Sequence, residues 1–580
     1  MQTEKGFLIA IGPGGTFLAG VDEPLGSGAA AHGYAVREGR IVPAREAEVP
    51  AEGALAHPPD GGLLSQVRWA PGLVEILTDP AGAFPVYSAH APGVLFLGTD
   101  AWAIAEEAEL RGLNAESALA LMAFEFVPGL ETLVDGLEEL PANCRVVFSR
   151  TEGGAWRREE QPLPRLSPVP AEPGASEADR VKAAAENLRA VCAPVASASG
   201  PVALNLSGGW DSRALLGVMA PRLGGDGLFT CTYGNGRFGG TELARRVSRE
   251  VGIPSRFHPF DDGRHLELWW LSLCREMPPV ARYNLSDGGK AVGENLYRGA
   301  ALATCGHSGD GNTKAQFPAS AAPADAEGLG AWAGRRYRSS LTDEEARDLL
   351  RPGSDGLAEA PGRLARETAR VAWEAESPVG SGVRWFLGQR VRRNVLSEVR
   401  LLERHAPVVF LPMMEPAFRA FWAGASAAEL TDQRLWRLAL RDHVFVEGMA
   451  ALGRLPREGG GFVDPDGPGN RAGSMARRVV MAAARRVAPG MASAAMDADP
   501  TVAWWRGDKR LFWFVHDTLM ASAFYSEHFE REALRLWLLR SRRSYRAART
   551  TVWNMMTVAG AERLLIGLKP SRFPPALRRG

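Results

Sequence analysis

The sequence predicts an α/β protein with two folded parts: an N-terminal α+β sandwich, and a larger part built on a doubly wound parallel sheet with a helical C-terminal region. Three observations lead to this prediction. Short strand-like segments open the chain, a proline-rich segment follows them, and helical and strand-like segments alternate beyond it. A chain of 580 residues also exceeds the size of one ordinary hydrophobic core, so we expect at least two domains.

Residues 1–162 contain short apolar segments bounded by Gly, Pro or Asp, which is typical of strands joined by tight turns. The clearest segments are Phe7 to Ile11, Leu73 to Thr78, Val94 to Gly98 and Arg145 to Ser149. One helix is expected between them, over Ala115 to Glu125, where the apolar residues recur at helical spacing. This mixture favours a sandwich made mainly of sheets.

A proline-rich segment separates the two parts. Five prolines fall in this segment, at Pro162, Pro164, Pro168, Pro170 and Pro173. Proline lacks a backbone donor and favours extended chain, so this composition is typical of a linker. We therefore place the domains at residues 1–162 and 179–580, with the linker at 163–178.

After the linker, helices and strands are expected to alternate. Helices are predicted at Glu177 to Cys192, Ser212 to Ala220 and Thr241 to Val251, and strands at Val202 to Leu206, Leu228 to Tyr233, Arg256 to Pro259 and Ala301 to Cys305. This alternation predicts parallel strands with helices on both faces of the sheet. Beyond about residue 380 the chain is rich in Ala, Arg, Leu and Trp and should be mostly helical.

Charge and cysteine content exclude several classes of function. Lys plus Arg and Asp plus Glu both number 67, so no net charge marks a nucleic acid or an anionic membrane as a partner. The one basic stretch, Arg531 to Arg549, has the spacing of an amphipathic helix with a solvated basic face. Five scattered cysteines indicate neither a disulfide framework nor a zinc site, and no segment resembles a signal peptide or a membrane span. A cytoplasmic protein that acts on a small ligand or a peptide is expected.

The segment Ser207-Gly208-Gly209-Trp210-Asp211-Ser212 follows a predicted strand and opens a predicted helix. Its glycines let the backbone approach an anion, its serine hydroxyls can donate hydrogen bonds, and the helix N-terminus adds partial positive charge. A carboxylate at Asp211 would repel a phosphate unless Mg²⁺ lies between them. A glycine turn with capping Asp and Ser would need no ligand, but strand, loop and helix in this order favour a nucleotide site.

This hexapeptide, called the pyrophosphate loop below, resembles the ATP-binding loop of the ATP pyrophosphatase superfamily. Members of that superfamily cleave ATP between its α and β phosphates, and many form acyl-adenylates. The resemblance implies ATP and Mg²⁺ as cofactors. It also implies a set of nucleotide-binding residues on the first two strands and in the loop, namely Leu204, Leu206, Ser207, Gly208, Gly209, Asp211, Ser212 and Thr232.

A second loop, Cys305-Gly306-His307-Ser308-Gly309-Asp310, follows the predicted strand Ala301 to Cys305. In the asparagine synthetase-like branch of the superfamily, a glycine-rich loop in this place ends in an aspartate that binds magnesium. The resemblance therefore implies Asp211 and Asp310 as metal ligands and Gly306 as a nucleotide contact. A turn-forming aspartate with no ligand is the alternative for Asp310.

Three segments of the N-terminal part resemble pieces of the glutaminase-like (Ntn-type) domain of the same branch. They are Asp79 to Tyr87, Phe96 to Asp100 and Gly136 to Pro141. That glutaminase uses a cysteine at its mature N-terminus, whereas residue 2 here is Gln2 and the first cysteine is Cys144. We therefore expect a degenerate domain that makes no ammonia from glutamine, and an amine that comes from the substrate itself.

Three more positions are candidates for catalysis, two of them with an alternative residue nearby. His307 lies near the position of a tyrosine that takes part in proton transfer in lactam-forming relatives, and an imidazole can act as a base near neutral pH. A histidine that bonds its own loop is the alternative. The family has an acidic residue shortly before a later proline. This sequence has no exact match for it, and the nearest substitutes are Glu398 and Glu403. Many relatives also have a lysine in the region of Arg457, and this arginine, or Arg454, could supply the charge.

The chain is therefore expected to be a macrolactam synthetase similar to lasso peptide cyclases. It would adenylate an Asp or Glu side chain of a precursor peptide and close an isopeptide ring with the peptide's N-terminal amine, releasing AMP and pyrophosphate. The resemblance implies a leader-peptide-binding protein and a leader protease as partners. The alternatives are a β-lactam synthetase-like or other asparagine synthetase-related amidoligase, a tRNA-modifying pyrophosphatase, and a relative that only binds nucleotide or peptide.

Overall fold

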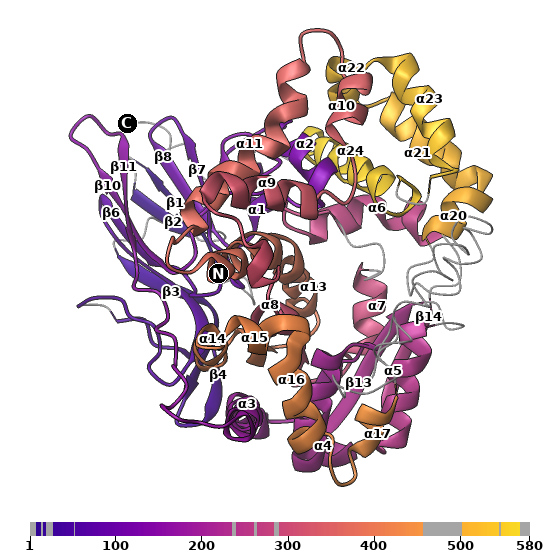
Figure 1. Ribbon diagram of the computed structural model, residues 1–580. Coiled ribbons are helices and arrows are strands. Elements are labelled where there is room, and N and C mark those ends of the chain that lie inside the picture. Colours follow the sequence, from indigo (N-terminus) through magenta and orange to yellow (C-terminus); the bar gives the residue numbers. More distant parts are fainter. Residues whose placement is uncertain are drawn as a thin grey trace.

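The computed structural model describes residues 7–12, 15–18, 27–50, 53–234, 239–259, 264–282, 289–455, 501–544 and 547–568. Its architecture is mixed α/β, with two antiparallel sheets, a parallel sheet and many helices, so the predicted fold class is confirmed at this level. In Figure 1 the antiparallel sheets lie on the left, the parallel sheet lies at the lower right, and the C-terminal helices lie at the upper right.

The N-terminal part contains the two antiparallel sheets. The first has the order β2-β1-β8-β7-β9, with β1 at Leu8–Gly12, β2 at Gly15–Leu18, β7 at Tyr87–Ala91, β8 at Val94–Gly98 and β9 at Leu137–Glu139. The second has the order β11-β10-β6-β5-β3-β4, with β3 at Gly28–Arg37, β4 at Arg40–Pro43, β5 at Gly62–Ala70, β6 at Leu73–Leu77, β10 at Cys144–Arg150 and β11 at Trp156–Pro162. The four strands predicted in this part are confirmed to within a few residues.

Helices form most of the remaining described structure. The first group is α1 at Ala101–Glu107, α2 at Ala115–Phe124, α3 at Glu177–Cys192, α4 at Trp210–Gly227, α5 at Gly239–Glu250, α6 at Arg264–Glu276, α7 at Gly289–Leu296, α8 at Gly309–Thr313, α9 at Ala326–Arg336, α10 at Asp343–Leu349 and α11 at Asp355–Ala372. The second group is α12 at Pro378–Trp385, α13 at Val399–Glu403, α14 at Pro416–Ala423, α15 at Ala427–Leu430, α16 at Arg434–Ala439, α17 at Ala450–Arg454, α20 at Thr501–Gly507, α21 at Lys509–Met520, α22 at Ala523–His528, α23 at Arg531–Ser541 and α24 at Val552–Ile566. Short π-helical segments are η4 at Phe386–Val395, η8 at Leu440–Val444 and η9 at Ala547–Thr551, and short 3₁₀ segments are η1 at Ala44–Glu46, η2 at Ala193–Ser197, η3 at Ala319–Ala321, η5 at Leu396–Glu398, η6 at Pro412–Met414 and η7 at Thr431–Gln433.

The two antiparallel sheets pack face to face because successive side chains of a strand point to opposite sides. Ile9 and Ile11 of β1 share a core with side chains of the second sheet, such as Val67. Their neighbours Leu8 and Ala10 point the other way and belong to a separate core that includes side chains of α1 and α2. The first sheet is therefore covered on both faces.

The C-terminal helices α20 to α24 pack on the N-terminal part rather than on the parallel sheet. Their side chains join the core that contains α1, α2 and α6, and the Asn554 side chain donates a hydrogen bond to the Met122 carbonyl (3.2 Å). The helix predicted over Arg531 to Arg549 is shorter than expected, because α23 ends at Ser541 and a separate π-helical segment follows at Ala547–Thr551. No helix among the described residues has both the length and the apolar composition that a membrane span requires.

The second part is organised around a parallel sheet with the order β14-β13-β12-β15-β16. Its strands are β12 at Val202–Asn205, β13 at Leu228–Gly234, β14 at Ser255–Pro259, β15 at Leu302–Cys305 and β16 at Val409–Phe410. The first four confirm the strands predicted there. The sequence did not predict β16, because a strand of two residues is too short to leave a periodic pattern.

The strand order reverses direction at β12. The chain adds β13 and β14 on one side of β12 and then returns to place β15 on the other side, with Asn205 of β12 opposite Cys305 of β15. In open parallel sheets the carboxyl ends of the strands at such a reversal leave a crevice, and ligands bind there. The pyrophosphate loop follows β12 and the second loop follows β15, so the topology brings these two loops together at this crevice.

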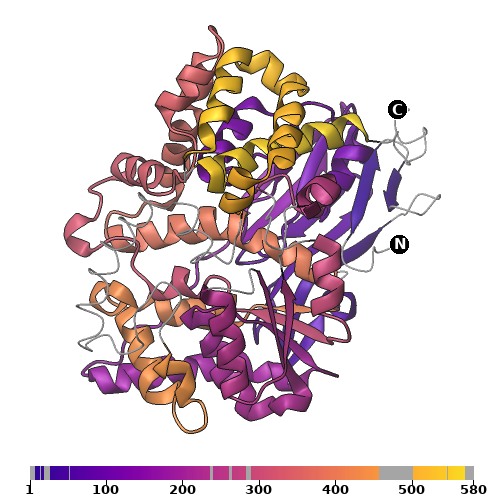
Figure 2. The ribbon, with the colours of Figure 1, turned by 90° about the vertical axis from the view of Figure 1, so that its right-hand side faces the viewer.

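A continuous helical segment, residues 378–403, connects the two parts and is called the central helix below. It comprises α12, η4, η5 and α13, and Figure 2 shows it crossing the middle of the molecule. On the N-terminal side, Arg392 and Arg393 form ion pairs with Glu139 of β9 at 2.5 and 2.6 Å. All three side chains are almost entirely buried. Farther along the same helix stands Glu398, one of the predicted site residues.

Replacing Glu139 should therefore be costly for stability. Glu139→Gln leaves two buried guanidinium groups without their counter-ion, and we expect the free energy of unfolding to fall by about 3–5 kcal/mol. Denaturant unfolding measures this difference, with Glu159→Gln on the exposed strand β11 as the matched control. An equal and small loss in both variants would contradict a stabilising role of this buried ion pair.

Candidate functional site

The pyrophosphate loop (residues 207–212) is shaped by its own serines. The Ser207 backbone N–H donates to the Ser212 hydroxyl (3.1 Å), the two hydroxyls lie 3.0 Å apart, and the Gly209 N–H donates to the Ser207 hydroxyl oxygen (3.2 Å). Gly209 is the N-cap of α4, and no side chain caps this helix. Because the N-cap is a glycine, an anion can approach the N–H groups of the first turn without meeting a capping side chain.

The second loop (residues 305–310) packs directly on the start of α4. A Cβ atom at Gly306 would lie 2.7 Å from the Ser212 nitrogen, and a Cβ atom at Gly309 would overlap the Asp211 carboxylate. Glycine is therefore required at both positions for the two loops to meet. The Asn312 side chain fixes the second loop further by donating to the Ser308 and Met413 carbonyls, at 3.0 and 3.1 Å.

The two predicted magnesium ligands are brought side by side. Asp211 Oδ2 accepts a hydrogen bond from the Asp310 backbone N–H (2.9 Å), and Asp211 Oδ1 accepts one from the Trp436 indole (3.0 Å). The Asp310 side chain is exposed at the opening of this site. No cluster of three or more His, Cys, Asp or Glu suited to a metal occurs in the part of the chain that the structure describes. Two carboxylates alone fit Mg²⁺, which is usually held by one or two carboxylates together with phosphate oxygens and water.

A buried arginine, Arg213, holds the pyrophosphate loop by hydrogen bonds. The Arg213 guanidinium donates to the carbonyls of Gly208 (3.1 Å), Leu452 (2.9 Å) and Leu455 (2.8 Å), and it lies 4.9 Å from the centre of the Trp210 ring. Burial lowers the pKa of Arg213 to about 10, so the group stays charged at neutral pH. Arg213 therefore ties the loop to the chain around residue 455. No sequence motif marks Arg213 as part of the site.

His307 has a partner that the sequence did not reveal. Its Nε2 lies 3.2 Å from Glu398 Oε2 on the central helix, and both side chains are 24% exposed. Burial opposes the charged form, but the adjacent Cys305 and Glu398 outweigh it and raise the pKa of His307 well above its usual value of 6.5. The raised pKa favours the charged imidazolium form of His307 beside Glu398. The other acidic candidate, Glu403, pairs instead with His32 of the N-terminal part (3.0 Å).

The remaining predicted residues take different places. Leu204 and Leu206 are buried in the hydrophobic core, so their side chains support the loop from inside the sheet. The Thr232 hydroxyl donates to the Leu206 carbonyl (3.0 Å), which ties the ends of β12 and β13 together. The Arg454 side chain is exposed at the end of α17, and Arg457 lies outside the described residues.

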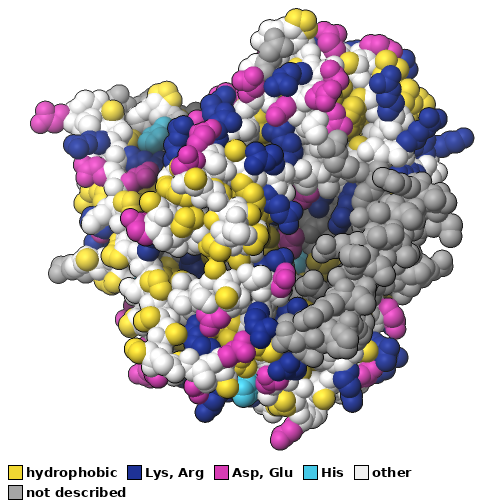
Figure 3. All heavy atoms as spheres, viewed as in Figure 1, with side chains coloured by type: hydrophobic (Ala, Val, Ile, Leu, Met, Phe, Trp, Pro, Cys, Tyr) yellow, Lys and Arg dark blue, Asp and Glu magenta, His cyan; other side chains and the backbone are white. Residues whose placement is uncertain are grey.

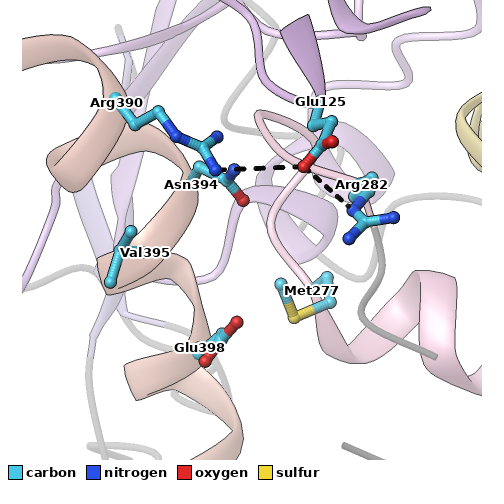
Figure 4. Close-up of a pocket in the computed structure, with 7 residues that line it drawn as sticks. All are labelled: Glu125, Met277, Arg282, Arg390, Asn394, Val395 and Glu398. Atoms are coloured by element: carbon cyan, nitrogen blue, oxygen red, sulfur yellow. Dashed lines mark ion pairs between the residues drawn. The ribbon is translucent and has the colours of Figure 1, made fainter. Parts of the chain in front are cut away.

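Glu398 also lines a cavity of about 120 Å³. Its walls come from the end of α2, the end of α6 and the chain that follows it, and the central helix, and its lining residues are Glu125, Met277, Arg282, Arg390, Asn394, Val395 and Glu398. Figure 4 shows both arginines directed at the Glu125 carboxylate and Glu398 facing the same space from below. Of this set only Glu398 could be predicted from the sequence, because the others come together from distant segments. Figure 3 shows a hollow in the middle of the face seen in Figure 1, with charged side chains at its edge.

A buried carboxylate, Glu415, lies between the two parts of the molecule. Glu415 accepts hydrogen bonds from the Tyr34 hydroxyl (2.5 Å) and from the Gly62 backbone N–H (2.8 Å). Burial raises the pKa of Glu415 to about 7, although these two hydrogen bonds oppose the shift. Tyr34 also accepts a hydrogen bond from the Leu411 N–H (3.2 Å), so Glu415 and Tyr34 join β3 to the segment that follows β16.

The raised pKa of Glu415 predicts a pH dependence of stability. A carboxyl that titrates near 4.5 when unfolded and near 7 when folded binds a proton preferentially in the folded state, so its contribution to stability falls as pH rises between these values. Between pH 5 and 8, we expect the stability of the parent relative to Glu415→Gln to fall by about 2–3 kcal/mol. Denaturant unfolding at a series of pH values measures this difference. A difference that does not change with pH would contradict the raised pKa.

Comparisons with known proteins add no relatives to this description. No model of a known protein family matches the chain, and a sequence search of curated proteins gives no match.

Proposed function

We propose that this protein is an ATP-dependent ligase that activates a carboxylate as its acyl-adenylate and joins it to an amine. The observation that carries the proposal is the meeting of two loops at the reversal of the parallel sheet. There the start of α4, whose N-cap is Gly209, lies beside two adjacent carboxylates, Asp211 and Asp310. Backbone donors suit phosphate oxygens, and the carboxylates suit the Mg²⁺ that accompanies ATP. In this proposal, residues 179–580 form an ATP pyrophosphatase domain and residues 1–162 form a glutaminase-like sandwich.

Each residue has a defined task in the proposed reaction. The substrate carboxylate attacks the α-phosphorus of ATP, which releases pyrophosphate and forms the acyl-adenylate. Mg²⁺ held by Asp211 and Asp310 would neutralise the phosphate charge during this step. An amine then attacks the acyl carbon and displaces AMP. As the amine nitrogen loses its proton, Glu398 can accept that proton while the positively charged His307 keeps the carboxylate in position.

The most specific form of the proposal is a macrolactam synthetase similar to lasso peptide cyclases. The amine and the carboxylate then belong to one precursor peptide, and the ring that forms is an isopeptide. A leader-peptide-binding protein and a leader protease would supply this peptide. A β-lactam synthetase-like activity is the second candidate, favoured by the position of the His307–Glu398 pair beside the second loop.

The test is ATP cleavage in the presence of a peptide encoded beside the gene. Formation of AMP and pyrophosphate together with a peptide that has lost the mass of one water molecule would support the macrolactam synthetase. AMP and pyrophosphate formed only with a small β-amino acid would favour the β-lactam synthetase-like reaction. Nucleotide binding without AMP formation under either condition would point to the non-catalytic alternative.

Glutamine should have no part in this reaction. Residue 2 is Gln2, and no cysteine precedes Cys144, so we expect no cysteine nucleophile of the kind with which glutaminases release ammonia. We expect no glutamate above background when the protein is incubated with glutamine and ATP, and no stimulation of product formation. Measured glutamate release that depends on the protein would contradict this expectation.

A further inference from the structure

Two guanidinium groups meet in the cavity beside Glu398. Arg282 Nε lies 3.4 Å from Glu125 Oε2, and Arg390 Nη2 lies 4.0 Å from the same oxygen. Close charge-assisted pairs between arginine and carboxylate are about 2.7–2.9 Å long, so neither arginine is bound tightly by Glu125. Each guanidinium carries five N–H donors in a planar fork that matches a carboxylate. Both arginines are partly accessible, with side chains 21% and 28% exposed.

The charged residues that line this cavity are two arginines and two glutamates. Arg282 and Arg390 face the single carboxylate of Glu125, and Arg549 also acts on that carboxylate. The other glutamate, Glu398, lies 3.2 Å from His307 Nε2 and so has a partner outside the arginine pair. Two guanidinium groups that face one carboxylate at 3.4 and 4.0 Å in a partly buried space favour a further anionic ligand.

The cavity lies beside the nucleotide loops and is not part of them. None of its lining residues belongs to the pyrophosphate loop or the second loop. Glu398 is the one residue that both lines the cavity and contacts His307. An anion held by the arginines would therefore lie on the cavity side of the His307–Glu398 pair. Met277 and Val395 add apolar walls that suit the short aliphatic stem of an acidic side chain.

We propose that Arg282 and Arg390 bind a carboxylate of the substrate that is not the activated one, on the same segment as the attacking amine. This inference rests on the proposed function and adds a substrate class to it: a peptide with an acidic side chain within a few bonds of its reacting amine. With the carboxylate held by the two arginines, the amine lies next to Glu398, the group proposed to accept its proton. Arg282 and Arg390 are thus specificity-determining residues.

Direct binding tests this inference without ATP. The probes are the dipeptides Gly-Glu-amide and Gly-Gln-amide, which share a free amine and differ in one carboxylate, and calorimetry measures their dissociation constants. We expect the parent to bind Gly-Glu-amide about tenfold more tightly or better, as for charge-assisted hydrogen bonds. Arg282→Gln and Arg390→Gln should each reduce this preference strongly. Arg335→Gln, which changes an exposed arginine on α9, should leave it unchanged.

A variant that is expected to bind more tightly separates a specific effect on the site from a loss of folding. Glu125→Gln removes the carboxylate that competes with the ligand, so it should tighten the binding of Gly-Glu-amide several-fold and leave Gly-Gln-amide almost unchanged. Equal affinity of the parent for both dipeptides would overturn the inference, and so would an unchanged preference in both arginine variants. If the arginine variants weaken the binding of inorganic pyrophosphate instead, the cavity belongs to the phosphate site. The binding assay contains no ATP. It can therefore fail while the ATP-cleavage assay succeeds, and it can succeed while that assay fails.

Discussion

Asp310→Asn is expected to slow the cleavage of ATP to AMP and pyrophosphate by roughly a hundredfold or more, because it removes one of two charges that would hold Mg²⁺ against the phosphates. The substitution is structurally mild. The Asp310 side chain is exposed, and the contact that fixes the residue is its backbone N–H, which donates to Asp211 and which asparagine keeps. Loss of activity in a folded Asp310→Asn variant therefore reports on charge. Pyrophosphate release with the peptide substrate measures it.

Asp211→Asn should be at least as damaging, for an additional reason. Both carboxylate oxygens of Asp211 accept hydrogen bonds, from the Asp310 N–H and from the Trp436 indole. An amide has only one oxygen, so its NH₂ group must face one of these donors, and the two loops should separate. Asp325→Asn is the matched control, because Asp325 caps α9 and asparagine is an equally good cap. Near-normal turnover in both site variants would contradict the proposed magnesium site.

The sequence predicted the secondary structure around the site well. The strand ending at Cys305 and the helix at Glu177–Cys192 lie where they were expected, because alternating and helical patterns of apolar residues are local signals. The same patterns cannot reveal which strands become neighbours. The place of β15 next to β12 is a property of the whole fold, and it is this placement that brings the second loop to the pyrophosphate loop.

Some residues of the candidate site share a local sequence motif, and others are brought together only by the fold. Ser207, Gly209 and Asp211 belong to one short motif, so sequence reasoning identified them together. The contact between His307 and Glu398 joins positions 91 residues apart, and it depends on the path of the central helix. The cavity residues Glu125 and Arg282 carry no motif at all. Their proximity arises because Phe126 and Ala281 form a bridge between distant segments.

The central helix gives the N-terminal part a structural role close to the candidate site. The ion pairs of Arg392 and Arg393 with Glu139 anchor this helix to β9, and Glu398 stands one to two turns farther along the same helix. A shift of the N-terminal part would therefore be transmitted to the His307–Glu398 pair. Since misplacing a catalytic group by about 1 Å can cost a hundredfold in rate, this anchoring is functionally relevant.

His307→Ala should permit adenylation but slow ring closure by about 10²–10⁴-fold, the usual range for loss of a group that assists proton transfer. In the proposed mechanism the proton-accepting atom is on Glu398, because the raised pKa of His307 makes the imidazole a poor proton acceptor. Glu398→Gln should therefore slow ring closure by a similar factor, and the double variant should be little worse than either single variant. His516→Ala, which removes another histidine paired with a carboxylate, is the matched control.

Trapping with hydroxylamine separates this role from a purely structural one. If the pair moves the proton, the acyl-adenylate still forms in His307→Ala, so the yield of trapped hydroxamate stays near that of the parent while the cyclised peptide is lost. If His307 only braces the second loop, its removal displaces Asp310 and injures the magnesium site on which adenylation depends. Hydroxamate and cyclised peptide would then fall by the same factor, and that result would remove the His307–Glu398 pair from the second step.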